Sequence, residues 1–142
     1  MIAEKFKRYK IVGLDTYIYA IREARTKCLD VICGDTYNLP FKTNNFDATI
    51  LIDTLEHLEY PEKVLSEAVR VARKSVILAV PNKTYAHDLT ACKAIFNYSR
   101  LYNLLHQFGD AEIFLLANAE SLLLGEPIST LLGAKRFIIK NK

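Results

Sequence analysis

Short continuous apolar runs recur along this chain, and longer stretches with a different periodicity separate them. Each run is five to eight residues long and rich in Val, Ile or Leu, which is typical of a strand that is buried on both faces. The pattern predicts six strands, at Lys10–Asp15, Leu29–Cys33, Phe46–Ile52, Ser75–Val80, Ala111–Asn118 and Ala134–Lys140.

Three of the intervening stretches have apolar residues at helical spacing. In Tyr17–Cys28 the apolar positions fall at offsets of 0, 3, 4, 7 and 11, which line one face of a helix. A second helix is expected over Pro61–Ala72, because proline suits a first helical position. A third helical region covers about Thr84–Gln107 and is long enough to hold two helices. The segment Ala119–Gly133 fits either a connection or a short helix.

Apolar strands that alternate with helices predict an α/β fold of three layers. Its centre would be a mainly parallel sheet of about six strands, with helices on both faces. The chain has 142 residues, of which 51% are hydrophobic and 25% charged, which is enough for one domain with its own core. We therefore expect residues 1–142 to form a single domain.

Composition and charge narrow the classes of function. The net charge of +3 comes without a basic stripe, so a nucleic-acid partner is not expected. The apolar runs are far shorter than the roughly 18 residues of a membrane span, and Met1–Arg8 carries charge instead of an apolar leader. We therefore predict a cytoplasmic protein with no membrane contact. Cys28, Cys33 and Cys92 lack a CxxC spacing and the histidines are scattered, so we expect buried free thiols and no metal site.

Polar residues follow four of the predicted strands, namely Asp15, Asp35, Asp53 and Asn82. Parallel sheets bind ligands at the carboxyl ends of their strands, so these side chains form a candidate site along one edge. There Asp15 could accept hydrogen bonds from both hydroxyls of a ribose, and Asp35 could accept one from an exocyclic amine. Asp is also common in turns and helix caps, and spacing alone favours that interpretation. His57, near the same edge, suits a structural role better than that of a general base.

A series of sequence segments resembles a known family. The segments are Ile11–Asp15, Val31–Asp35 with Leu39–Phe41 and Asn45–Asp47, and Leu55–Leu58 with Pro61–Leu65 and Glu67–Val71. As a series from about Lys10 to Asn82, they are similar to class I S-adenosylmethionine-dependent methyltransferases of the broad small-molecule type. Beyond Asn82 the resemblance is one of architecture only.

The resemblance implies a Rossmann-like fold, S-adenosylmethionine as the cofactor and a small molecule as the methyl acceptor. It assigns Asp15 to the cofactor ribose, and Asp35 with Thr36 to the border of the adenine. The strand end at Asp53 would lie beside the methionine part and the reacting methyl group. Methyl transfer in such enzymes rests largely on the alignment of donor and acceptor, so no catalytic residue is assigned.

The sequence departs from the family at its amino end. In the family, a strand and a glycine-rich loop of the type D/E-x-G-x-G-x-G come before the strand at Lys10, where this sequence has nine residues. The five glycines lie too far apart to form that loop, so we expect a truncated domain that lacks the first strand-helix unit and the cradle of the cofactor. The absent strand is the central one. The strands that hold Asp15 and Asp53 would therefore pair directly, or another chain would fill the gap.

Two hypotheses about function follow. The first is a methyltransferase that acts on a small molecule, which the retained Asp15 and Asp35 favour. The second is a non-catalytic methyltransferase homologue, either a binding or regulatory subunit or a dimeric remnant, which the absent loop favours. Its partner would be a second copy or an intact methyltransferase. In a third interpretation the natural chain starts upstream of Met1. Four residues could line an acceptor pocket, namely Tyr85, His87, Tyr98 and Tyr102, although aromatic residues on a long helix are more often core or interface.

Overall fold

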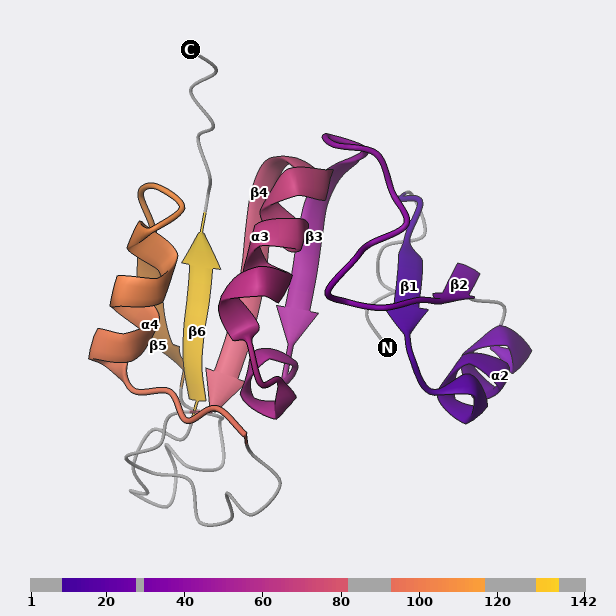
Figure 1. Cartoon of the computed structure of the whole chain (residues 1–142), viewed down its shortest axis with the longest axis horizontal. Helices are drawn as coiled ribbons and strands as arrows, with labels where there is room; N and C mark the ends of the chain where they lie inside the picture. The colour runs from indigo at the N-terminus through magenta and orange to yellow at the C-terminus, as the bar shows by residue number, and fades with distance from the viewer. Residues whose placement is uncertain (1–8, 28–29, 82–92, 117–129, 136–142) are drawn as a thin grey trace. The chain divides into compact units, whose positions relative to one another are not determined.

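The computed structural model describes residues 9–27, 30–81, 93–116 and 130–135, which are coloured in Figure 1. The chain consists of two units, Met1–Pro40 and Phe41–Lys142, and each is described by itself. Both contain strands and helices, which confirms the α/β class. That the whole chain is one domain stays a prediction. In the part of the chain that the structure describes, no helix is long and apolar enough to cross a membrane.

The first unit is a strand-helix-strand motif. Strand β1 (Val12–Asp15) and strand β2 (Asp30–Cys33) pair in parallel. Helix α2 (Ile18–Thr26) connects them, as the periodicity predicted. The register places Asp15 opposite Cys33, so both strands end at the same edge of the sheet.

Close packing fixes the two strands of this unit against each other. A methyl group on Gly13 would lie 2.7 Å from Cγ1 of Val31, and one on Gly34 would lie 2.8 Å from Cδ1 of Leu14. A side chain at either position would therefore force Val31 or Leu14 to shift, and glycine leaves room for these two side chains as they stand. Arg25, in the last turn of α2, donates from Nη2 to the carbonyl oxygen of Val31 at 3.2 Å.

The second unit contains a four-stranded sheet in the order β3-β4-β6-β5. The strands are β3 (Phe46–Ile52), β4 (Ala72–Pro81), β5 (Glu112–Leu116) and β6 (Thr130–Lys135). Strands β3 and β4 run parallel, whereas β6 pairs antiparallel with both β4 and β5 (Figure 1).

The described residues therefore hold six strands, and hydrogen bonds divide these into one sheet of two strands and one of four. The two sheets lie in separate units, so the direct pairing of the strands that hold Asp15 and Asp53 stays a prediction. The last strand starts at Thr130, earlier than the expected Ala134 and inside the segment Ala119–Gly133. The rest of that segment, and residues 136–140, lie outside the described residues.

Two short elements follow β3. The turn η1 (Leu55–His57) is a 3-10 helix, and helix α3 (Pro61–Val71) begins with the proline that predicted it. Helix α3 packs on the sheet through a stripe of small and branched side chains, Val64, Leu65, Ala68 and Val71. The hydroxyl of Thr49 in β3 donates to the carbonyl oxygen of Ala68 at 3.1 Å, which adds a polar link between the layers.

Helix α4 (Tyr98–His106) is much shorter than the predicted helical region Thr84–Gln107. Residues 93–97 are not helical, so the prediction is wrong there, and residues 82–92 lie outside the described residues. The physical reason is the cap: Asn97 is extended, and its Oδ1 accepts a hydrogen bond from the amide of Arg100 at 2.8 Å.

One face of the β3-β4 pair is left uncovered by the described residues. Helix α3 lies in front of this pair in Figure 1 and buries Val76 and Leu78 of β4. On the opposite face, Ile50 is 50% exposed, Ile52 is 45% exposed and Ile77 is 37% exposed. Ile50 and Ile77 are partners in the ladder, so the three isoleucines form one apolar patch.

Candidate functional site

Asp15 and Asp35 leave the carboxyl edge of the first unit side by side. The amide of Gly34 donates to the carbonyl oxygen of Asp15 at 3.1 Å, which continues the ladder by one residue and leads directly into Asp35. Both aspartates are exposed. The structure therefore brings together two of the residues that the sequence marked, on neighbouring strand ends.

The two carboxylates are held in the same way. Oδ1 of Asp15 accepts the amide of Tyr17 at 2.8 Å, and Oδ1 of Asp35 accepts the amide of Tyr37 at 2.9 Å. Each bond spans two residues, so it closes an Asx turn that fixes the carboxylate against its own backbone. Within the described residues, Oδ2 of each group has no protein partner and is free to accept from a ligand.

Thr36 lies inside the turn that follows Asp35. The amide of Asn38 donates to the carbonyl oxygen of Asp35 at 3.2 Å, so Thr36 is the first central residue of this turn and is half-buried. The turn therefore gives this edge a fixed shape. The role of Thr36 at the border of the adenine stays a prediction.

Cys33 is the ladder partner of Asp15 and precedes Asp35 by two residues, and its thiol is exposed. The sequence predicted buried thiols, and for Cys33 that prediction is wrong. Cys33 is the last residue of a four-residue strand, and its Sγ lies 3.9 Å from the carbonyl oxygen of Thr16. Cys28 and Cys92 lie outside the described residues.

Asp53 ends β3 in the second unit, as predicted. It has a φ of 46°, in the left-handed region that non-glycine residues seldom adopt. Its amide donates to the carbonyl oxygen of Ala79 in β4 at 3.1 Å, which holds the strained residue at the strand end. The carboxylate is exposed.

Glu56 was not marked by the sequence. Its side chain is 3% exposed and Oε2 has no hydrogen-bond partner. Burial raises the pKa of the Glu56 carboxyl and the negative charge of Asp53 adds to this effect, while a hydrogen bond from the backbone amide of Glu56 itself and the nearby His57 oppose it. The sequence shows only a polar residue in a polar stretch, and charged residues are rarely buried, so no pattern signals this one.

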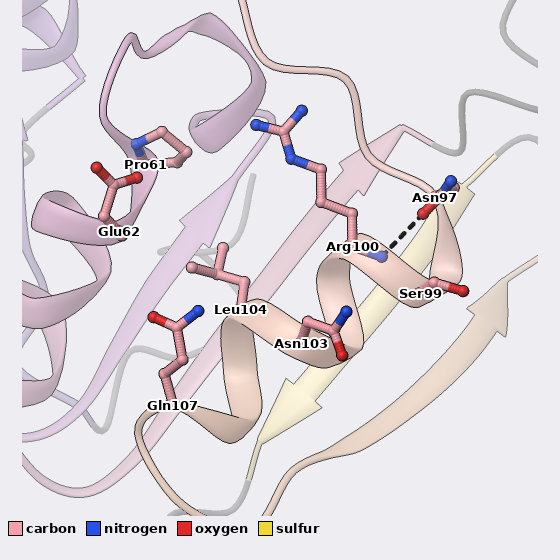
Figure 2. A pocket seen from close by; sticks show the side chains of 8 residues that line it. All are labelled: Pro61, Glu62, Asn97, Ser99, Arg100, Asn103, Leu104 and Gln107. Atoms are coloured by element: carbon pink, nitrogen blue, oxygen red, sulfur yellow. Dashed lines mark hydrogen bonds between the residues drawn. The ribbon is translucent and has the colours of Figure 1, made fainter.

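A hollow of about 570 Å³ lies between the start of α3 and helix α4 (Figure 2). Its lining is mostly polar and consists of Pro61, Glu62, Asn97, Ser99, Arg100, Asn103, Leu104 and Gln107. In Figure 2 Arg100 and Glu62 project from facing helices, so the hollow presents both signs of charge. It is wide open to solvent and includes none of the aspartates discussed above.

Tyr98 and Tyr102 do not line this hollow. They stack with a centroid distance of 6.2 Å, and Tyr102 stacks on His106 at 3.8 Å. The two tyrosines are 51% and 42% exposed, so this stripe is neither core nor pocket in the part of the chain that is described.

Comparison with known proteins gives a family and a fold. The family model described as a methyltransferase domain matches residues 1–80, more than half of the chain. The uncharacterized protein MJ0638 of Methanocaldococcus jannaschii is 34% identical over 109 residues, which are 75% of this chain and 46% of that protein. The chain therefore spans about half the length of this relative.

Two solved structures share the fold. One is a SAM-dependent methyltransferase from Archaeoglobus fulgidus, with a TM-score of 0.69, 19% identity, and coverage of 94% of this chain and 80% of that one. The other is a Haloferax volcanii protein solved in complex with the Trm112 methyltransferase activator. Its TM-score is 0.78 at 16% identity, over 92% of this chain and 72% of that one. These likenesses confirm the predicted Rossmann-like methyltransferase fold.

Proposed function

Because the chain belongs to the methyltransferase domain family, whose cofactor is S-adenosylmethionine, we propose that it binds this cofactor and serves methyl transfer to a small molecule. The observation that carries the proposal is the pair of Asx-turn carboxylates on neighbouring parallel strand ends. Each is held by its own backbone and keeps one oxygen for a ligand.

Asp15 fits the ribose of the cofactor. Its carboxylate is an acceptor only, and the turn to Tyr17 leaves Oδ2 to receive hydroxyl donors. Charge-assisted hydrogen bonds of this kind are stronger than neutral ones, so one fixed carboxylate can orient a ribose.

Asp35 and Thr36 fit the adenine border. Oδ1 of Asp35 is occupied by the amide of Tyr37, so its Oδ2 is the group available to an exocyclic amine. Thr36, held in the turn, offers a hydroxyl and a methyl group beside it. Asp53, at a strand end of the second unit, is proposed to lie next to the reacting methyl group.

Bound S-adenosylmethionine supplies a methyl group on a positively charged sulfur. The residues proposed here bind and orient, and none of them is assigned to proton transfer. Holding donor and acceptor in line accounts for much of the rate in such reactions. The cytoplasmic location stays a prediction.

The second hypothesis, a non-catalytic homologue with a protein partner, is supported by a different observation. The isoleucine patch on β3 and β4 is apolar and uncovered by the described residues, as expected of a surface that another chain covers. We propose a second copy of this chain as the occupant, with an intact methyltransferase as the alternative outcome of the test.

Calorimetric titration of the 142-residue chain with S-adenosylmethionine and with S-adenosylhomocysteine tests cofactor binding. We expect Asp15→Ala and Asp35→Ala each to weaken binding about tenfold or more, because a lost hydrogen bond to a charged group costs roughly 1.5–3 kcal/mol. The matched control is Asp30→Ala, which removes an exposed aspartate at the opposite end of β2.

No binding at millimolar ligand would overturn the enzyme proposal for this chain and leave the non-catalytic homologue. If Asp30→Ala weakens binding as much as Asp15→Ala does, the proposed roles of the Asp15 and Asp35 carboxylates are wrong. Formation of S-adenosylhomocysteine with a panel of small amines, phenols and thiols then identifies the class of acceptor.

A further inference from the structure

Glu56 joins two segments at the carboxyl edge of the β3-β4 pair. Its carbonyl oxygen accepts the amide of Lys93 at 2.8 Å and that of Ala94 at 2.9 Å. The turn η1, which follows β3, is thereby tied to the segment that leads into α4. The carbonyl oxygen of Glu56 therefore links the two segments through two hydrogen bonds.

The side chain of the same residue is buried at a cost. Glu56 is 2% exposed, and in the part of the chain that the structure describes it is the only buried residue of charged type. Oε2 finds no donor, and Oε1 lies 3.8 Å from Nε2 of His57, which is too far for a hydrogen bond. Among the described residues, the backbone amide of Glu56 itself is the one hydrogen-bond donor that favours the ionised form, and an ionised carboxylate with so few partners is far costlier to bury than a neutral one.

The charged groups around Glu56 do not remove this cost. Asp53, from the end of β3, opposes ionisation of the carboxyl, and His57, half-exposed in η1, favours it weakly. Lys93, from the segment before α4, contacts Glu56 through its backbone amide, and no ion pair joins the two side chains. Burial is therefore the largest influence on the pKa of Glu56, and it raises that pKa.

We propose that Glu56 is a protonation-controlled latch between the turn after β3 and the segment that precedes α4. With a neutral carboxyl group, the side chain stays buried and the two backbone hydrogen bonds hold the segments together. When the carboxyl loses its proton to solvent, the charge draws the side chain towards water, because water solvates it better than the interior does. Movement of Glu56 then lengthens the bonds from Lys93 and Ala94 and frees the edge beside Asp53.

The direction of the effect follows from the raised pKa. The proton is retained to a higher pH in the closed state, so the latch is closed at low pH and opens as the pH rises through the pKa of the buried carboxyl. The inference does not depend on methyl transfer, since the latch is a property of these residues alone.

Amide hydrogen exchange of Lys93 and Ala94 tests the latch. Exchange is measured on the 142-residue chain over a pH series and divided by the intrinsic rate at each pH. We expect the protection of both amides to fall about tenfold as Glu56 ionises, and Glu56→Gln to abolish this pH dependence, because its side chain has no proton to lose. Glu62→Gln, an exposed acid in the first turn of α3, is the control and should behave as the unchanged chain.

Equal pH dependence in the chain with and without Glu56→Gln would overturn the proposal, and so would protection that rises or stays constant with pH. If Glu56→Gln does not fold, NMR titration of the unchanged chain tests the latch instead. The carboxyl carbon of Glu56 and the amide nitrogens of Lys93 and Ala94 should then titrate with one common midpoint in NMR spectra. Different midpoints would overturn the latch.

Discussion

Burial of the Glu56 carboxyl makes the stability of the whole protein depend on pH. Burial, and to a smaller extent Asp53, raises its pKa above the ordinary 4.5, so the folded state keeps the proton to a higher pH than the unfolded state does. The contribution of the protonated Glu56 carboxyl to the free energy of unfolding is complete below about pH 4.5. It is lost as the pH rises through the raised pKa of the folded state.

Glu56→Gln should therefore gain stability relative to the unchanged chain as the pH rises from 4 to 8. Each unit by which the folded and unfolded pKa values differ contributes about 1.4 kcal/mol to the gap. Urea denaturation at several pH values measures it, and Glu62→Gln should show no such gap. A gap that is constant across the series would mean that the Glu56 carboxyl titrates alike in both states.

At the same scale, the sequence located some candidate residues and not others. The placement of Asp15 and Asp35 at a sheet edge was predictable because each acid stands at or shortly after the end of an apolar run that forms a strand. Glu56 was not, because its burial depends on segments far away in sequence, such as Lys93 and Ala94. The prediction of a buried thiol at Cys33 was wrong for a similar reason, because the exposure of a residue at a strand end depends on which other segments cover it.

At the scale of elements, the boundaries depend on caps that apolar periodicity does not reveal. The periodicity predicted the region of α4 but not its start, which Asn97 sets by accepting the amide of Arg100. By contrast, α3 was predicted well because Pro61 marks its start and its apolar stripe continues to Val71.

Asn97→Ala should destabilise the protein by about 1 kcal/mol, because it removes the hydrogen bond that caps α4. Asn97→Asp should retain that bond and add a favourable charge at the helix start. The control is Asn103→Ala, an exposed position in the middle of the same helix. Urea denaturation measures the differences, and equal losses for the two alanine variants would show that the cap contributes nothing.

For the whole molecule, strand pairing was the least predictable feature. Each apolar run predicted a strand, but an apolar run does not show which strand pairs with it or whether the two run parallel or antiparallel. The antiparallel pairs of β6 with β4 and β5 follow from contacts between distant segments. The family resemblance supplied the fold, while the uncovered face of β3 became visible only in the structure.

That face carries the last prediction, which concerns association. β3 pairs only with β4 among the described residues, and its outer edge lies beside an apolar patch that includes Ile50 and Ile77, an arrangement that favours addition of another chain. We expect sedimentation at tens of micromolar to give twice the chain mass of 16.2 kDa. Ile50→Glu should shift the chain to a monomer, because it would place a charge in the covered patch.

The matched control for association is Ile18→Glu on α2, which changes an isoleucine of similar exposure, 44%, in the first unit. It should leave the dimer intact. A dimer that survives Ile50→Glu would place the contact elsewhere. A chain that is monomeric at every concentration would exclude a second copy as the occupant, and addition of an intact methyltransferase would then test the other partner through the same Ile50→Glu comparison.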